Sequence, residues 1–227
     1  MNNICMTVLT DGRKEYISKA LPTWIDAYDN QIEKKFIIDD SGDSEYREWL
    51  ASEFPSFTIV PVSSSRGGYV EAMRKVFSTA VYSGAEYCLH IEDDFILHKP
   101  FIIDDVISVL NSNPSVSQMS FMRQPWYANE ISAGGVIEAL ENQDGAAEYI
   151  EKNTDGKDWT MHKGFWTCNP SIFPIWTANR RWPDAPWSEM KFGQKLFINE
   201  KSCGIWGNRK DWVCVEHIGR ERNGTGY

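Results

Sequence analysis

The 227-residue sequence contains no long apolar run. No stretch approaches the ~18 apolar residues that a membrane span needs, so we expect no transmembrane helix. The first apolar stretch, residues 4–9, is too short for the core of a signal peptide and has no basic lead-in. Internal repeats and low-complexity segments are also missing, and a composition that is 42% hydrophobic excludes wholesale disorder. These features predict a single domain over residues 1–227.

Cysteine is sparse and unpatterned, because the five cysteines are odd in number and form no C-x-x-C motif. Neither a disulfide framework nor a zinc cluster is indicated. Most of these cysteines stand beside apolar residues, where a buried free thiol is the ordinary state. We therefore expect a protein of a reducing, cytoplasmic compartment.

Positive charge is the scarcer sign, with 23 Lys and Arg against 32 Asp and Glu and a formal net charge of −9. This balance argues against a protein that coats nucleic acid by charge alone, but it allows an enzyme that touches nucleic acid locally. The basic residues most suited to such a local patch lie near the end of the sequence: Lys191, Lys195, Lys201, Arg209 and Lys210.

The first half alternates between strand-like and helix-like patterns. Apolar strand-length runs occur at 4–9, 35–38, 57–62 and 87–91, and helical spacing of apolar residues follows the first three. Pro22 falls inside the first helical pattern and predicts a kink or a late helix start. Strands that alternate with helices at this pace predict a parallel α/β sheet.

Polar, acidic segments follow three of these four strands: T-D-G at 10–12, D-D at 39–40 and E-D-D at 92–94. Ligands bind beyond the carboxyl ends of the strands in such sheets. Three successive carboxylates repel one another, and a divalent cation is a common compensation, although an acidic loop in water is the alternative.

The second half has a different rhythm. Residues 116–122 and 212–215 are the strands that we expect there, residues 142–156 are polar and turn-rich, and residues 159–193 combine five tryptophans with four prolines in a loop-like segment. We divide the domain into a ligand-binding half, 1–110, and an irregular, aromatic-rich half, 111–227.

This order of segments resembles the nucleotide-sugar-binding half of a GT-A glycosyltransferase of the broad family 2 type. I-D-D-S-G-D at 38–43 is similar to that family's V-D-D-G-S-x-D with Gly and Ser exchanged, R-G-G-Y at 66–69 matches its turn into a helix, and E-D-D at 92–94 resembles its D-x-D motif. More narrowly, L-T-D-G-R at 9–13, R-Q-P-W at 123–126 and G-G at 134–135 resemble small glycosyltransferases that tailed bacteriophages encode.

The resemblance implies a GT-A fold, a mixed and mainly parallel sheet flanked by helices, with the second half binding the acceptor. It implies metal-dependent transfer of a sugar from a nucleotide diphosphate sugar, with UDP favoured, to a hydroxyl group with inversion. For a phage enzyme the acceptor is a hydroxylated DNA base (DNA modification), a virion protein or a glycan, and the compartment is the host cytoplasm. A nucleotidyltransferase and an inactive carbohydrate-binding protein are the rival hypotheses.

Carried over by residue, the resemblance makes Asp94 and His217 ligands of a divalent metal, Mn²⁺ or Mg²⁺. Residues that it assigns to the nucleotide sugar are Thr10, Asp11, Arg13, Asp39, Asp40, Arg66, Gly67 and Asp93. Asp40 or its neighbour Asp39 would contact the base, Arg66 the diphosphate, and Asp93 the ribose or the metal's water. The alternative for the segment at 39–43 is a helix N-cap, which Ser41 or Asp43 would provide.

Glu189 is the expected base that takes the proton of the acceptor hydroxyl. Here Ser188 replaces one acidic residue of the family's usual pair, and a capping role for Ser188 and Glu189 is the alternative. Trp166, Asn169 and Trp187 resemble the wall of the sugar and acceptor site, although a tryptophan is more often core than platform. The end of the sequence, 220–227, is expected to close over the diphosphate.

Overall fold

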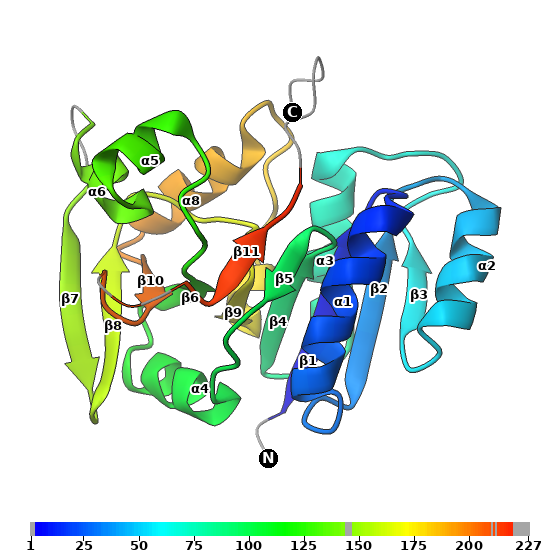
Figure 1. Cartoon of the computed structure of the whole chain (residues 1–227), viewed down its shortest axis with the longest axis horizontal. Helices are drawn as coiled ribbons and strands as arrows, with labels where there is room; N and C mark the ends of the chain where they lie inside the picture. Colours follow the sequence, from blue (N-terminus) through cyan, green and yellow to red (C-terminus); the bar gives the residue numbers. More distant parts are fainter. Residues whose placement is uncertain (1–2, 144–146, 210, 212, 220–227) are drawn as a thin grey trace.

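The computed structural model describes residues 3–143, 147–209, 211 and 213–219. Its centre is a nine-stranded sheet with the strand order β3-β2-β1-β4-β9-β6-β10-β8-β7 (Figure 1). In that spatial order the strands are Thr58–Pro61, Lys34–Asp39, Ile4–Thr10, Tyr87–Glu92, Ser171–Pro174, Val116–Phe121, Ser202–Trp206, Lys157–His162 and Tyr149–Thr154. A separate two-stranded sheet pairs β5 (Phe95–Leu97) with β11 (Val215–His217).

The four strands of the first half, β1 to β4, are parallel to one another, so that their carboxyl ends meet at one edge of the sheet. In the second half, β9 runs antiparallel to both β4 and β6, while β6 and β10 are parallel. Strands β7 and β8 form an antiparallel hairpin at the far edge. The predicted α/β class with a mixed sheet is confirmed.

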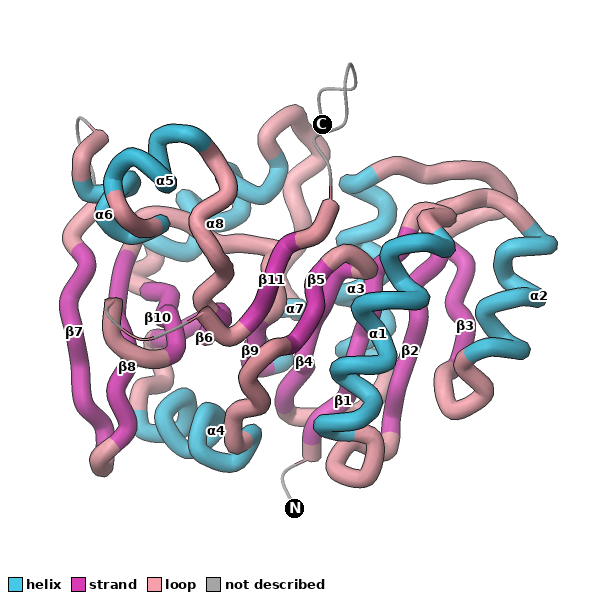
Figure 2. Tube along the Cα trace, in the orientation of Figure 1, coloured by secondary structure: helices cyan, strands magenta, loops and turns pink. Residues whose placement is uncertain are grey.

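Helices cover both faces of this sheet, with α1 in front of it and α3 behind it (Figure 2). The helices are α1 (Lys14–Tyr28), α2 (Ser44–Glu53), α3 (Tyr69–Tyr82), α4 (Ile103–Ser112), α5 (Ala128–Ala133), α6 (Val136–Glu141), α7 (Ile175–Ala178) and α8 (Ser188–Ile198). Side chains of β1 alternate between the two faces. Met6 and Val8 belong to a core with α1, α2 and α4, and Cys5 and Leu9 to a core with α3, α7 and α8.

The predicted strands of the first half, and the strand at 116–122, are confirmed within one or two residues at their ends. The late helix start that Pro22 predicted is wrong, because α1 begins at Lys14 and continues through the proline to Tyr28. The buried face of α1, which includes Leu21 and Trp24, stabilises the helix across the missing backbone N–H.

The second half is more regular than its sequence predicted. The segments 142–156 and 159–193 contain β7, β8, β9 and α7, and β10 was also missed. Asp155 and Gly156, with φ of 50° and 80°, close the β7–β8 hairpin, a two-residue turn that needs positive φ. The last strand begins at Val215 rather than 212, and residue 212 lies outside the described residues. Across the described ranges, the structure has no helix both long and apolar enough to span a membrane.

Candidate active site

A cavity of about 510 Å³ opens beyond the carboxyl ends of β1, β2 and β4, where α3 begins. Its lining comes from those strand ends, the start of α3 and the segment before α8: Leu9, Thr10, Asp11, Arg13, Asp40, Arg66, Gly67, Gly68, Tyr69, Val70, Ala72, Glu92, Asp93, Ala185 and Ser188. Each residue predicted to bind a nucleotide sugar lines this cavity except Asp39. The register that makes these strands parallel brings the three acidic segments together.

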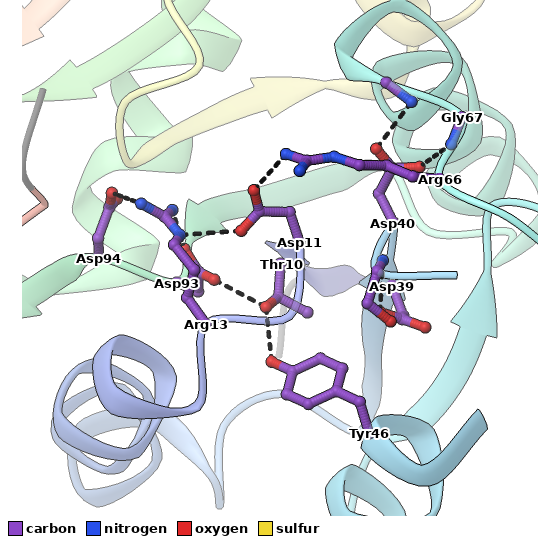
Figure 3. Close-up of polar contacts among 12 residues, drawn as sticks. Thr10, Asp11, Arg13, Asp39, Asp40, Tyr46, Arg66, Gly67, Asp93 and Asp94 are labelled. Atoms are coloured by element: carbon purple, nitrogen blue, oxygen red, sulfur yellow. Dashed lines mark hydrogen bonds and ion pairs between the residues drawn. The ribbon is translucent and has the colours of Figure 1, made fainter. Parts of the chain in front are cut away.

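The two adjacent aspartates at the end of β2 have different roles. The carboxylate of Asp39 is fully buried, accepts the backbone N–H of Ser41 at 2.9 Å and pairs with Arg47 at 3.2 Å, so that it faces away from the cavity. The carboxylate of Asp40 lines the cavity and accepts the backbone N–H groups of Gly67 and Gly68 at 2.7 and 2.9 Å (Figure 3). Burial raises the pKa of Asp40, and these two N–H groups oppose that rise.

Two neighbouring details concern the N-cap of α2 and the turn that contacts Asp40. The N-cap of α2 is Asp43, whose carboxylate accepts the backbone N–H of Glu45 at 2.8 Å, so Asp40 is free of that task. At Gly67 a Cβ atom would lie 2.9 Å from Cγ1 of Val62 and 3.2 Å from Oδ1 of Asp40, so the contact between this turn and Asp40 requires a glycine.

Arg13 is the centre of the acidic cluster, since its guanidinium contacts three carboxylates (Figure 3). Its Nε lies 2.9 Å from Asp11, its Nη1 lies 2.8 Å from Asp94, and its Nη2 pairs with Asp93. Arg66 reaches the other oxygen of Asp11 at 2.6 Å. Burial lowers the pKa of Arg13, but the charges of Asp93 and Asp94 outweigh that effect and raise it, so the guanidinium stays charged.

Asp93 is almost completely buried beneath this arginine. Thr10 donates its hydroxyl hydrogen to Asp93 at 2.7 Å and accepts the hydroxyl hydrogen of Tyr46, also at 2.7 Å. Burial raises the pKa of Asp93 to about 7, although Arg13 and Thr10 act to lower it. Both carboxylate oxygens of Asp93 are thus engaged, by Thr10 and by Arg13, at the wall of the cavity.

Asp94 and His217, the predicted metal ligands, lie side by side, with 3.4 Å between Asp94 Oδ2 and His217 Nε2. The other carboxylate oxygen of Asp94, Oδ1, is buried and has no hydrogen-bond partner among the residues that the structure describes. A Cβ atom at Gly219 would collide with Asp94 Oδ2 and lie 2.9 Å from His217 Nε2, so the space over the pair admits no side chain. Burial raises the pKa of Asp94, but His217 and Arg13 outweigh it and hold that pKa below its ordinary value.

This pair fits a divalent cation, because a carboxylate oxygen and an imidazole nitrogen are both suitable ligands and Oδ1 of Asp94 has no partner within the described part of the chain. Among the described residues, no group of three or more His, Cys, Asp or Glu side chains is placed to hold a metal ion. A cation at Asp94 and His217 would therefore take its remaining ligands from water or from a bound phosphate.

The R-Q-P-W segment holds His217 in place. The side-chain amide of Gln124 donates to the backbone carbonyl of His217 at 2.8 Å and accepts its backbone N–H at 2.9 Å. The ring of Trp126 lies 4.5 Å from the imidazole, and Phe95 of β5 stacks on the imidazole at 4.7 Å. The resemblance to phage enzymes identified this segment from the sequence, but it did not predict that the segment positions His217.

Glu189 lies in the first turn of α8, directly after the cavity-lining residue Ser188. Its Oε1 accepts the backbone N–H of Cys168 at 2.7 Å, which fixes the carboxyl group in one orientation. Burial raises the pKa of Glu189, and this hydrogen bond opposes the rise only in part. A carboxyl group held in place with a raised pKa is suited to general-base chemistry.

The aromatic wall is only partly where the sequence predicted it. Trp166 is 1% exposed and packs among Phe77, Trp182 and Phe192, so it is a core residue and the wall prediction for it is wrong. Tyr69 is the aromatic residue that lines the cavity, with its hydroxyl donating to Cys168 Sγ at 2.7 Å, and its place directly after R-G-G was the available signal.

Two other predicted wall residues do not line the cavity. Asn169 is half-buried and donates its backbone N–H to the hydroxyl of Thr167 at 3.1 Å. Trp187 is 69% exposed and stands immediately before α8 in the left-handed region, with φ of 58°. The predicted closing segment, which includes Arg220 and Arg222, lies outside the described residues.

The fold of this chain is similar to the folds of solved structures that contain bound nucleotide sugars. The chain is similar to the mannosyltransferase PcManGT from Pyrobaculum calidifontis in complex with GDP-Man and Mn²⁺, with a TM-score of 0.64, 13% identity, and coverage of 97% of this chain and 58% of that one. It is also similar to residues 1–349 of TarS from S. aureus in complex with UDP-GlcNAc, with a TM-score of 0.63, 11% identity, and coverage of 100% of this chain and 60% of that one.

The fold is therefore that of GT-A glycosyltransferases, and the chain spans about three fifths of the length of these structures. No family profile matches the sequence. No curated protein matches it either.

Proposed function

We propose that this protein is a metal-dependent glycosyltransferase that moves a sugar from a nucleotide diphosphate sugar to a hydroxyl group with inversion. The observation that carries the proposal is the cavity at the carboxyl ends of parallel strands, which is lined by Asp40, Arg66, Glu92 and Asp93. That edge is where sheets of this kind bind nucleotides. The similarity in fold to proteins solved with GDP-Man and UDP-GlcNAc supports the same assignment.

The donor nucleotide would occupy the part of the cavity between Asp40 and Arg66. The base contacts Asp40, with UDP favoured, and the diphosphate lies towards Arg66 and the start of α3. The positive end of the helix dipole of α3 favours phosphate there. Thr10, Asp11 and Arg13 border this part of the cavity.

Asp94 and His217 would hold the divalent cation, Mn²⁺ or Mg²⁺, with Asp93 beside its water shell. When bound, such an ion neutralises the diphosphate charge that develops as the glycosidic bond breaks. Arg13 adds a second, fixed positive charge on the same carboxylates. The N–H of Cys168 orients Glu189, whose carboxylate takes the proton of the acceptor hydroxyl.

The acceptor side of the cavity is formed by Ala185 and Ser188, with Trp187 exposed beside them. The acceptor hydroxyl belongs to a DNA base, a virion protein or a glycan if the resemblance to phage enzymes holds. In that case the protein acts in the host cytoplasm.

Thermal unfolding in the presence of UDP-, GDP- and other nucleotide sugars, with and without Mn²⁺, tests the donor and the metal together. A donor at 100 times its dissociation constant stabilises the fold by about 2.7 kcal/mol, a readily measured shift. We expect a shift that requires Mn²⁺ and disappears in Asp94→Asn. The matched control is Asp26→Asn, which removes an exposed carboxylate on α1. A wild-type protein that no nucleotide sugar stabilises would contradict the proposal.

A further inference from the structure

A second, smaller groove lies on the other side of the segment that precedes α8. It has a volume of about 410 Å³ and is lined by α3 and by residues 178–182, including Arg74, Arg180, Arg181 and Trp182. Three arginines around one groove are unusual in a protein with a net charge of −9. Nothing in the proposed chemistry uses them.

Most of the positive charge at this groove lacks a carboxylate partner. Arg74 pairs with Glu71 at 2.5 Å and with Asp184 at 3.4 Å. By contrast, within the described ranges no carboxylate lies in ion-pair range of Arg180 or Arg181. Arg181 is exposed, so its charge is available to a ligand.

Lys201 adds a further cation at this end of the molecule. The guanidinium of Arg180 lies 5.6 Å from the ring of Trp176, and the ammonium of Lys201 lies 5.0 Å from the same ring. Two like charges on one indole repel each other, and the ring compensates only in part. An anion bound between them would relieve this repulsion. Lys201 belongs to the basic patch that the sequence predicted and lies beside Trp176. Arg209, another residue of that predicted patch, pairs instead with Glu141 of α6.

The groove and the donor cavity share one wall. Val70 of α3 lines the cavity and Arg74, one helical turn later, lines the groove. Likewise Trp182 lines the groove and Ala185 lines the cavity, and the ion pair between Arg74 and Asp184 connects the two elements between them.

We propose that this groove binds phosphodiester groups of the acceptor, so that the protein glycosylates a hydroxyl on a polyanionic, phosphodiester-linked chain. The inference rests on the proposed function, because it concerns the acceptor of that transfer. Phosphates in the groove hold the chain while a hydroxyl one or two units away reaches Glu189 across the shared wall.

Fluorescence anisotropy with two labelled probes tests the groove: an abasic sugar-phosphate decamer and a single-stranded thymidine decamer. The test variant is Arg180→Gln/Arg181→Gln. The charge-matched control is Lys152→Gln/Lys163→Gln, which removes two exposed cations from the β7–β8 region. We expect wild type and control to bind both probes. In the test variant we expect binding about tenfold weaker and a salt dependence reduced by about one to two charges.

Failure of the abasic probe to bind wild type at 50 mM salt, or equal binding by the test variant, would overturn the inference. The donor experiment on the same proteins separates the two proposals. If a nucleotide sugar stabilises wild type and the abasic probe does not bind, only the groove assignment fails. If no nucleotide sugar binds, the acceptor role falls with the proposed function.

Discussion

At the scale of single residues, burial of the Glu189 carboxyl destabilises the ionised fold, yet the proposed function depends on this same group. Burial raises its pKa, so the folded protein holds this proton at pH values where the unfolded chain has released it. Stability therefore falls as pH rises from the ordinary glutamate pKa to the raised one, and below both values the effect vanishes. The buried carboxylate of Glu189 therefore lowers the free energy of unfolding at pH values above its raised pKa, although the proposed general base must be ionised to act.

We predict that Glu189→Gln is more stable than wild type at pH 8 and equally stable at pH 4. The amide keeps an oxygen for the N–H of Cys168 and has no charge to bury, so the gain is about 1.4 kcal/mol for each unit by which the pKa is raised. Release of nucleoside diphosphate from the donor should fall at least about 100-fold. Thermal unfolding at both pH values measures the first effect.

The exposed residue Glu53, at the end of α2, provides the control Glu53→Gln, which should change neither stability nor turnover. Equal melting temperatures of Glu189→Gln and wild type at pH 8 would show that the carboxyl is not desolvated. Undiminished release of nucleoside diphosphate would remove it from the role of base.

At the scale of elements, the placement of His217 depends on a strand of three residues. Strand β11 pairs with β5 in a register that sets His217 opposite Phe95, and Val215 also forms an isolated bridge with Arg123. Gln124, from the segment after β6, completes the hydrogen bonding of His217 with two backbone contacts. A ligand on so short an element is positioned by its neighbours more than by its own strand.

We predict that Gln124→Ala lowers the affinity for Mn²⁺ by about 10- to 100-fold, the usual effect of removing a group that orients a ligand. The melting temperature without metal should change little, because Gln124 is only half-buried. Electron paramagnetic resonance of free Mn²⁺ measures the affinity directly. Gln194→Ala, at an exposed position of α8, is the matched control. Unchanged Mn²⁺ affinity in Gln124→Ala would show that Gln124 does not position the histidine.

How far the elements could be predicted depended on burial. Strands β1, β2 and β4 are buried along nearly their whole length and appear as apolar runs, so both they and the acidic edge that follows them were predictable. Strand β9 is equally buried but has four residues and ends in Pro174. Strand β7 lies at the sheet edge with mostly exposed side chains, so its sequence resembles a loop.

The site residues that could be predicted are likewise those that follow a recognisable buried strand. Asp40, Asp93 and Asp94 follow predictable strands, and their convergence follows from parallel pairing. The core position of Trp166 and the separate orientation of Asp39 depend on packing between distant segments, and no local pattern contains that information. The contacts of Arg13 with Asp93 and Asp94 likewise exist only after β1 and β4 pair.

At the scale of the whole molecule, buried groups of opposite kind give opposite responses to pH. His90 of β4 and His162 of β8 are both buried in the sheet, and burial lowers the pKa of each to about 3. The unfolded chain binds these protons below the ordinary histidine pKa of about 6.5. Their contribution to stability is therefore complete above that value and is lost as pH falls towards about 3. Glu189 has the opposite effect because its pKa is raised. Acidification therefore removes the destabilisation caused by the buried Glu189 carboxylate, while protonation of His90 and His162 destabilises the fold.

We predict that His162→Gln flattens the acid side of the stability profile. His162 stacks on Tyr149 at 5.2 Å and accepts the backbone N–H of Gly164 at 3.3 Å, so the variant should be less stable at pH 7. Between pH 6.5 and pH 4 the wild type should lose stability faster than the variant, by up to about 1.4 kcal/mol per pH unit. Urea unfolding at four pH values across this interval measures both profiles. His98→Gln, at a half-exposed histidine, controls for removal of an imidazole from the surface. A stability difference between wild type and His162→Gln that stays constant from pH 7 to pH 4 would show that His162 takes up its proton without unfolding.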